Sequence, residues 1–160
     1  MGIQLQHVEA KLAELGLSLP DAGAVAGNYV AVARFDNALY VSGQISKNAD
    51  GSLITGKLGS DLDVDAGQKA AQSSALQIIA QALAALGESE SIARIIKLNG
   101  FVNAAPDFEK HPAVINGASD LIVAVFGEAV GNHARAAVGM GSLPFNVAVE
   151  IDAVIGIESA

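Results

Sequence analysis

The chain has 160 residues, of which 51% are hydrophobic, 16% are charged and none is cysteine. Intrinsic disorder is excluded, because disordered chains combine low hydrophobicity with high charge density. Polar residues and glycines interrupt every apolar run before it reaches the roughly 18 residues of a membrane span, so the sequence predicts a soluble single domain with no membrane partner. Because so few charges are available to cover its outside, we expect the chain to associate with copies of itself.

Net charge and the N-terminal sequence bear on partners and location. Nine lysines and arginines stand against seventeen aspartates and glutamates, which gives a net charge of -8 and argues against nucleic acid as a partner. The first ten residues lack the basic segment and apolar core of a signal peptide, and without cysteine there is no disulfide framework. We therefore expect a cytoplasmic protein.

The N-terminal part of the chain predicts a helix and a linker. Leucines and a valine recur at steps of three and four over residues 4–15, and Gly16 follows as a stop signal, which is typical of a short amphipathic helix. A linker rich in Pro, Gly and Ala covers residues 17–27. We accordingly divide the chain into an N-terminal helix and linker, residues 1–26, and a main domain, residues 27–160.

The main domain is predicted to open with a hairpin. Two β-prone runs, residues 29–35 and 39–45, meet across the turn dipeptide Asp36-Asn37. A second turn at residues 48–51 predicts that the chain continues into a short third strand.

The rest of the main domain predicts two long helices and three strands. The first helix begins after Asp63, a good N-cap, and ends before Gly87, while the second covers residues 112–126 and stops at Gly127. The strands are predicted at residues 92–102, 134–138 and 147–157. This order favours an α+β sandwich in which a mixed β-sheet carries two long helices on one face.

The common catalytic and metal-binding motifs are missing. The three histidines, His7, His111 and His133, are isolated from one another, and there is no cysteine, so no metal site is predicted. Ser42 precedes Gly43 without the leading glycine of a nucleophile elbow, and no phosphate-binding glycine motif opens a helix. We expect no cofactor.

Arg135 and Glu150 are the charged residues that most suggest a site. Arg135 lies among small residues with no acid near it in sequence, so it is either a receptor for an anion or an exposed surface arginine. Glu150 alternates with apolar residues in the last strand, which also fits a solvated face. If the last two strands form an antiparallel hairpin, a turn between Ser142 and Leu143 places the two charges opposite each other as a cross-strand pair.

Several short motifs together resemble the RidA family, also called the YjgF family. The matching residues fall in order over about residues 27–157. They are Tyr29, Tyr40-Val41-Ser42-Gly43-Gln44-Ile45, Asp50-Gly51, Ile95-Ile96-Lys97, Pro106-Asp107-Phe108, Ala134-Arg135, Val138, Leu143-Pro144 and Val149-Glu150-Ile151.

This resemblance implies a chorismate-mutase-like fold and a homotrimer with three clefts between subunits. It also implies cofactor-free hydrolysis of 2-enamine and 2-imine intermediates to 2-keto acids and ammonia. By position, Arg135 matches the arginine that holds the substrate carboxylate, and Glu150 matches the glutamate that activates water. Ser42 and Gly43 match the segment that lines the pocket, and Tyr29 matches a tyrosine of the cleft wall.

The chain departs from the family pattern in ways that define a subgroup. Asn28 stands where a proline usually precedes the tyrosine, Ala137 stands where some members have cysteine, and the N-terminal helix is extra. An alternative function is a non-catalytic trimeric protein that binds a small carboxylate. A third, ribonuclease activity, is disfavoured by the negative net charge.

Overall fold

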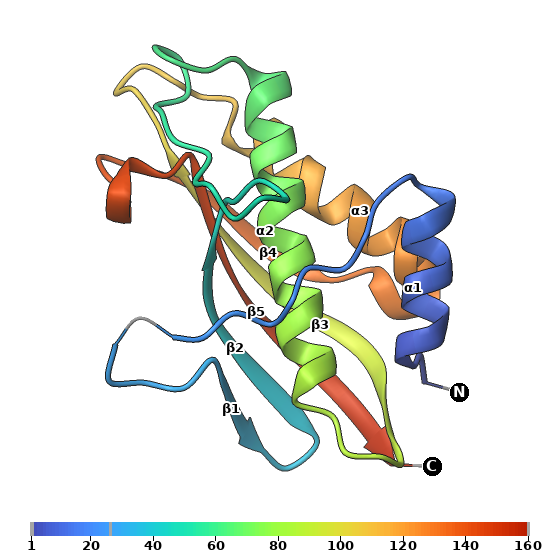
Figure 1. Cartoon of the computed structure of the whole chain (residues 1–160). Coiled ribbons are helices and arrows are strands. Elements are labelled where there is room, and N and C mark those ends of the chain that lie inside the picture. Colours follow the sequence, from blue (N-terminus) through green and yellow to red (C-terminus); the bar gives the residue numbers. More distant parts are fainter. Residues whose placement is uncertain (1, 26, 160) are drawn as a thin grey trace.

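The computed structural model describes residues 2–25 and 27–159, which form a five-stranded mixed sheet with its long helices on one face (Figure 1). This arrangement confirms the predicted α+β class. The elements in chain order are α1 (Leu5–Glu14), β1 (Val32–Phe35), β2 (Ala38–Ile45), α2 (Val64–Ala84), β3 (Glu90–Asn103), α3 (His111–Gly131), β4 (Ala134–Met140), the 3-10 turn η1 (Pro144–Asn146) and β5 (Val149–Ser159).

The strand order in the sheet is β1-β2-β5-β3-β4. β1 and β2 form the predicted antiparallel hairpin, with Asp36 in the left-handed region at its turn. β5 lies between β2 and β3 and is antiparallel to both, whereas β4 is parallel to β3 at the far edge. The predicted third strand is wrong, because Leu53 and Thr55 make only isolated bridges.

The predicted hairpin of the last two strands is also wrong. β3 lies between β4 and β5, so these two strands are not paired. The reason is the long helix α3, which carries the chain from the end of β3 back to the start of a parallel neighbour. A parallel connection needs such a crossover, and the strand that follows it is not obliged to return as a hairpin.

Local sequence signals account for both long helices. The Asp63 carboxylate accepts a hydrogen bond of 2.8 Å from the Ala66 N–H and caps α2 as predicted. The stop predicted at Gly127 is present as a break with φ of 73°, although one further turn follows it. Gly117 lets α3 approach α2 closely, because a β-carbon there would stand 2.1 Å from the Gln68 carbonyl oxygen.

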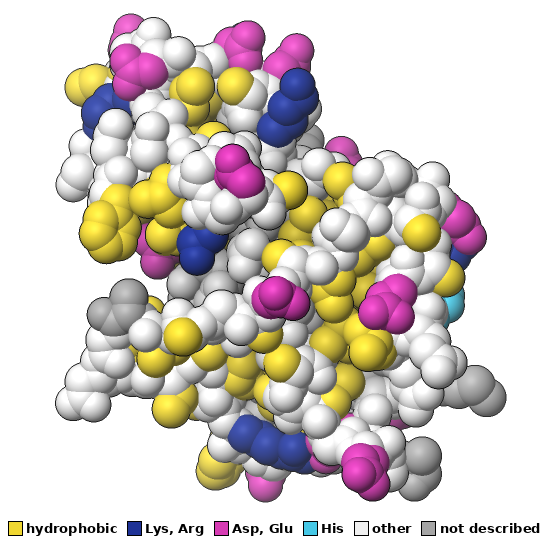
Figure 2. Space-filling view, viewed as in Figure 1, with side chains coloured by type: hydrophobic (Ala, Val, Ile, Leu, Met, Phe, Trp, Pro, Cys, Tyr) yellow, Lys and Arg dark blue, Asp and Glu magenta, His cyan; other side chains and the backbone are white. Residues whose placement is uncertain are grey.

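The hydrophobic core lies between the sheet and the helices. Its fully buried side chains include Leu98, Ile122 and Ile151, and α1 adds Val8 and Leu12 to the same core. By length and composition alone α3 could span a membrane, but its apolar face packs into this core. Figure 2 shows charged side chains scattered thinly over the surface, with hydrophobic ones gathered between them.

Among the described residues, helices cover only one face of the sheet (Figure 1). Tyr40 and Val138 point to the other face and are 48% and 44% exposed. Exposed apolar side chains on a sheet face are often covered by association with another chain.

Candidate functional site

A β-bulge in β2 is the local feature on which the candidate site is built. The pairing of β2 with β5 shifts between Val41 and Gln44, so Ser42 and Gly43 together stand opposite Asp152. A bulge of this kind twists the strand and changes where the neighbouring side chains point. The Ser-Gly-Gln segment singled out in the sequence is therefore an irregularity in the strand.

The carboxylate of Glu150 occupies the space that Gly43 leaves open. A β-carbon at Gly43 would stand only 2.1 Å from Glu150 Oε1, so any side chain there would displace the carboxylate. Glu150 is half-buried, and the pKa of its carboxyl is raised, first by desolvation and second by the nearby negative charge of Asp152. A glutamate with a raised pKa is a better proton acceptor near neutral pH than an ordinary one.

Glu150 lines a pocket of about 170 Å³ at the edge of β2, beyond the end of β1. We call it the Glu150 pocket. The predicted site residues Tyr29 and Gly43 also line it. Pockets for drug-sized ligands measure roughly 300–1,000 Å³, so this one suits a small molecule. Figure 2 shows the surface hollowed on its left side, where η1 and the segment after α1 approach each other.

The pocket has walls that sequence reasoning missed. One is the arm, which we define as residues 16–25 between α1 and β1, with Gly23–Val25 against the pocket. Gln81 of α2 fixes the arm by donating its side-chain amide to the Gly23 carbonyl at 2.7 Å. A glutamine among the buried residues of a helix face was the available signal, because a buried amide needs a hydrogen-bond partner.

Phe145 was missed as well. It lines the pocket from η1, is 72% exposed and has φ of 56°. A bulky residue in the left-handed region is strained, and such strain is common at functional sites. The Leu143-Pro144 pair marked this turn in the sequence, but the conformation of the next residue follows only from the three-dimensional contacts.

Two of the predicted residues, Ser42 and Tyr29, differ in their relation to the Glu150 pocket. The Ser42 hydroxyl donates a hydrogen bond of 2.7 Å to the Val30 carbonyl, which ties the bulge to the segment that leads into β1. Tyr29 is 53% exposed at the margin of the pocket. Ser42 therefore shapes the strand, whereas the exposed ring of Tyr29 can contact a ligand in the pocket.

Arg135 lies on the other edge strand and is held by α3. Its Nη1 donates to Ser119 Oγ at 3.1 Å, and its Nη2 donates to the Pro112 carbonyl at 3.2 Å. Five N–H groups belong to a guanidinium, so these two bonds leave donors for an anion. Because it is anchored in this way, Arg135 is no freely moving surface arginine.

His133 fixes the direction of the hydrogen bonds around Ser119. Its Nδ1 lies 2.6 Å from the Gly131 carbonyl, which can only accept, so Nδ1 carries the proton. In the neutral ring Nε2 is then the acceptor, and it lies 3.0 Å from Ser119 Oγ. The hydroxyl therefore donates to His133 and presents its lone pairs to Arg135.

Within one chain, Arg135 and Glu150 cannot contact the same small ligand. Arg135 lies beside the buried Leu98 in the register of β4 with β3, so its side chain faces the helices. Glu150 lies beside Phe101 in the register of β5 with β3, so its side chain faces the uncovered side of the sheet. Their strands are also two strand spacings apart, roughly 10 Å. The predicted cross-strand pair is therefore wrong, because β3 separates the two strands and the two side chains point to opposite faces.

In the part of the chain that the structure describes, no group of three or more His, Asp and Glu side chains could hold a metal ion. The chemistry available at the two edges of the sheet is that of a desolvated carboxylate and an anchored guanidinium.

Two long helices packed on one face of a five-stranded mixed sheet define the chorismate-mutase-like class of α+β proteins. Within that class the chain belongs to the YjgF family, since the family model described as "YjgF/chorismate mutase-like, putative endoribonuclease" matches residues 9–153. The RidA/YjgF resemblance drawn from the sequence motifs is thereby confirmed.

Individual relatives extend over nearly the whole chain. Protein TCP17 from Trypanosoma cruzi is 50% identical over 153 residues, covering 96% of both chains. The crystal structure of Atu1372 from Agrobacterium tumefaciens, a protein of unknown function, is 49% identical with a TM-score of 0.86, covering 96% of this chain and 94% of that one. The structure of Escherichia coli TdcF with bound serine is 25% identical with a TM-score of 0.58, covering 87% and 94%.

Proposed function

We propose that this protein hydrolyses reactive 2-enamine and 2-imine intermediates to 2-keto acids and ammonia, without a cofactor, at a site between two copies of the chain. The observation that carries the proposal is the Glu150 carboxylate, seated over Gly43 in a small pocket and raised in pKa by burial and by Asp152. Family membership supports the proposal, and so does the serine bound to TdcF, which is a small molecule with an α-carboxylate.

The site is proposed to lie between copies because its two halves lie at opposite edges of the sheet of each chain. The Glu150 pocket lies by β2, and Arg135 lies on β4. An assembly that joins one copy's β4 edge to the next copy's β2 edge is head-to-tail, and such contacts give a ring when the rotation between copies closes. We propose a homotrimer, in which three such contacts make three complete sites.

Arg135 has the task of binding the substrate carboxylate. A guanidinium can donate two parallel hydrogen bonds to a planar anion, which fixes its orientation as well as its position. Ser119 and the Pro112 carbonyl hold the guanidinium in place, so little side-chain entropy is lost when the ligand binds.

Glu150 has the task of moving protons. As water attacks the imine carbon, the Glu150 carboxylate accepts a proton from the water and returns it to the nitrogen, giving a carbinolamine. It then accepts the hydroxyl proton and delivers it to the nitrogen as the C–N bond breaks. The products are the 2-keto acid and ammonia, and the carboxylate is regenerated.

Hydrolysis of a freshly generated 2-imino acid tests the proposal. Because hydrogen bonds to charged groups are worth roughly 1.5–3 kcal/mol, Arg135→Ala is expected to lower kcat/KM by about 10- to 100-fold. Glu150→Gln is expected to lower kcat more than KM, while the exposed controls Arg94→Ala and Glu128→Gln stay near wild type. A wild-type rate no higher than that of buffer would refute the proposal.

The second candidate function is binding of a small carboxylate without turnover, which the serine-bound TdcF structure favours. It predicts that pyruvate raises the Tm of the wild type, that Arg135→Ala abolishes the shift, and that no imine is consumed. The same purified proteins serve both experiments, so the two functions are distinguished directly.

A further inference from the structure

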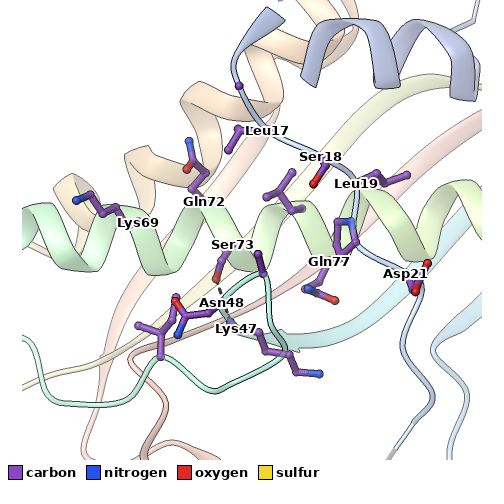
Figure 3. A pocket seen from close by; sticks show the side chains of 15 residues that line it. Leu17, Ser18, Leu19, Asp21, Lys47, Asn48, Lys69, Gln72, Ser73 and Gln77 are labelled. Atoms are coloured by element: carbon purple, nitrogen blue, oxygen red, sulfur yellow. Dashed lines mark hydrogen bonds between the residues drawn. The ribbon is translucent and has the colours of Figure 1, made fainter. Parts of the chain in front are cut away.

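A second and larger pocket runs along the outer face of α2, about 580 Å³ in volume. We call it the arm groove. Its floor is α2 between Lys69 and Gln77, one wall is the arm from Gly16 to Asp21, and the other wall is the turn that follows β2. Figure 3 shows Leu17, Ser18 and Leu19 on one side of the helix and Lys47 and Asn48 on the other. Its volume falls within the roughly 300–1,000 Å³ of small-molecule sites.

Hydrogen bonds hold both walls of the groove against the rest of the fold. Gly16 turns the chain with φ of 70°, and the Leu17 N–H donates to the Leu12 carbonyl at 2.8 Å, which starts the arm across α2. On the other side, the Lys47 N–H donates to Ser73 Oγ at 3.0 Å (Figure 3). Both walls are therefore held in place by hydrogen bonds within the chain.

The lining of the groove combines apolar surface with unpaired cations. Leu17, Leu19 and Leu76 line it and pack against the core. Lys47 is half-buried and Lys69 is exposed, and across residues 2–25 and 27–159 neither ammonium group has a hydrogen-bond or ion-pair partner.

The groove carries more positive than negative charge, unlike the chain as a whole. Two lysines and a single acid, Asp21, line it, in a chain whose net charge is -8. Figure 3 shows Asp21 far along the arm from Lys69, with Gln72 and Gln77 between them along α2. The amide groups of these two glutamines likewise have no partner within the described residues.

We propose that the arm groove is a second ligand site, which binds a small organic anion carrying an aliphatic body. The acid group pairs with the lysine ammonium groups, and the aliphatic body covers the leucine side chains. A lysine suits this task because its ammonium on a flexible stem acts as a point charge toward an anion. Lys47 lines both the arm groove and the Glu150 pocket, so the two sites adjoin each other at this residue.

Titration of the full-length protein with octanoate, followed by amide chemical shifts, tests this proposal without any enzymatic turnover. Octanoate is expected to bind saturably and to shift the amides of the arm and of α2 around Gln72. Lys69→Gln is expected to weaken binding about threefold, since an exposed ion pair is worth roughly 0.2–1 kcal/mol. Octanol, which lacks the charge, is expected to bind more weakly.

A steric variant and a matched charge control make the test decisive. Ala49 is an exposed residue of the groove wall, so Ala49→Trp is expected to fold and to block octanoate. The control Lys110→Gln removes an exposed lysine that does not line the groove and is expected to leave binding unchanged. Shifts confined to other regions, or an affinity that neither Lys69→Gln nor Ala49→Trp changes, would overturn the proposal.

Discussion

Gly43→Ala tests most simply whether the position of the Glu150 carboxylate matters. The added β-carbon would stand 2.1 Å from Glu150 Oε1 and 3.0 Å from its Cδ, whereas ordinary contacts begin near 3.4 Å. The carboxylate must therefore move by about 1.3 Å, which is the difference between 3.4 and 2.1 Å. A misplacement of about 1 Å in a catalytic group can cost on the order of 100-fold in rate.

The expected result is a loss of roughly 100-fold in kcat/KM for imine hydrolysis, with a small change in Tm. Gly141→Ala is the matched control, because a β-carbon at that position has no atom within 4 Å. It is expected to hydrolyse the imine at the wild-type rate. If Gly43→Ala stayed within twofold of wild type, the carboxylate position argued from the bulge would be refuted.

Three further predictions concern pH dependence, anchoring of the arginine and acid stability. Because the pKa of Glu150 is raised, kcat/KM should rise with pH, and the midpoint of this rise should lie above the pKa of an ordinary glutamate. Asp152→Asn removes the second negative charge and should move the midpoint to lower pH. A midpoint that does not move would contradict the role of Asp152. Because the Ser119 hydroxyl holds Arg135, Ser119→Ala should weaken pyruvate binding about three- to tenfold, and Ser119→Thr should restore it. Calorimetry measures these affinities. Equal affinities in all three proteins would show that the hydrogen bond to Arg135 is irrelevant to binding. The hydrogen-bonded ion pair with Arg34 lowers the pKa of Glu90 to about 2. The stability that this carboxylate adds is therefore present above pH 4.5 and is lost as pH falls towards 2. Urea unfolding of Glu90→Gln should show a smaller loss over that window, and an unchanged pH dependence would contradict the assignment.

Much of the fold follows from local signals in the sequence. The Asp63 cap, the Asp36-Asn37 turn and the alternation around Glu150 each report on a few neighbouring residues, and the helix and strands that they predict are present. The pairing of the last strands does not follow from such signals. A loop between two strands resembles a hairpin connection whether or not a third strand lies between them, and only the packing of α3 on the sheet decides the matter.

The candidate site, like the fold, was predicted only in part from the sequence. Gly43, Glu150 and Tyr29 are close in the fold because they lie on or beside paired strands, and their motifs identify them in the sequence. Gln81 and Phe145 had weaker signals, a buried amide in a helix face and a Leu-Pro turn, and neither signal shows that the side chain reaches the pocket. Arg135 and Glu150 were both singled out in the sequence, but their pairing within one chain was wrong, since their placement on opposite faces of the sheet follows only from the strand order and register.

The central claim is that each site takes Arg135 from one copy and Glu150 from the next, and co-expression of two inactive variants tests it. Arg135→Ala and Glu150→Gln chains, carrying different affinity tags, are expected to form doubly tagged mixed trimers in which about one interface in three combines an intact arginine with an intact glutamate. Imine hydrolysis by these trimers should then recover to about a third of the wild-type rate. If doubly tagged trimers were as inactive as each variant alone, both residues would have to act from the same chain, and the account would be wrong.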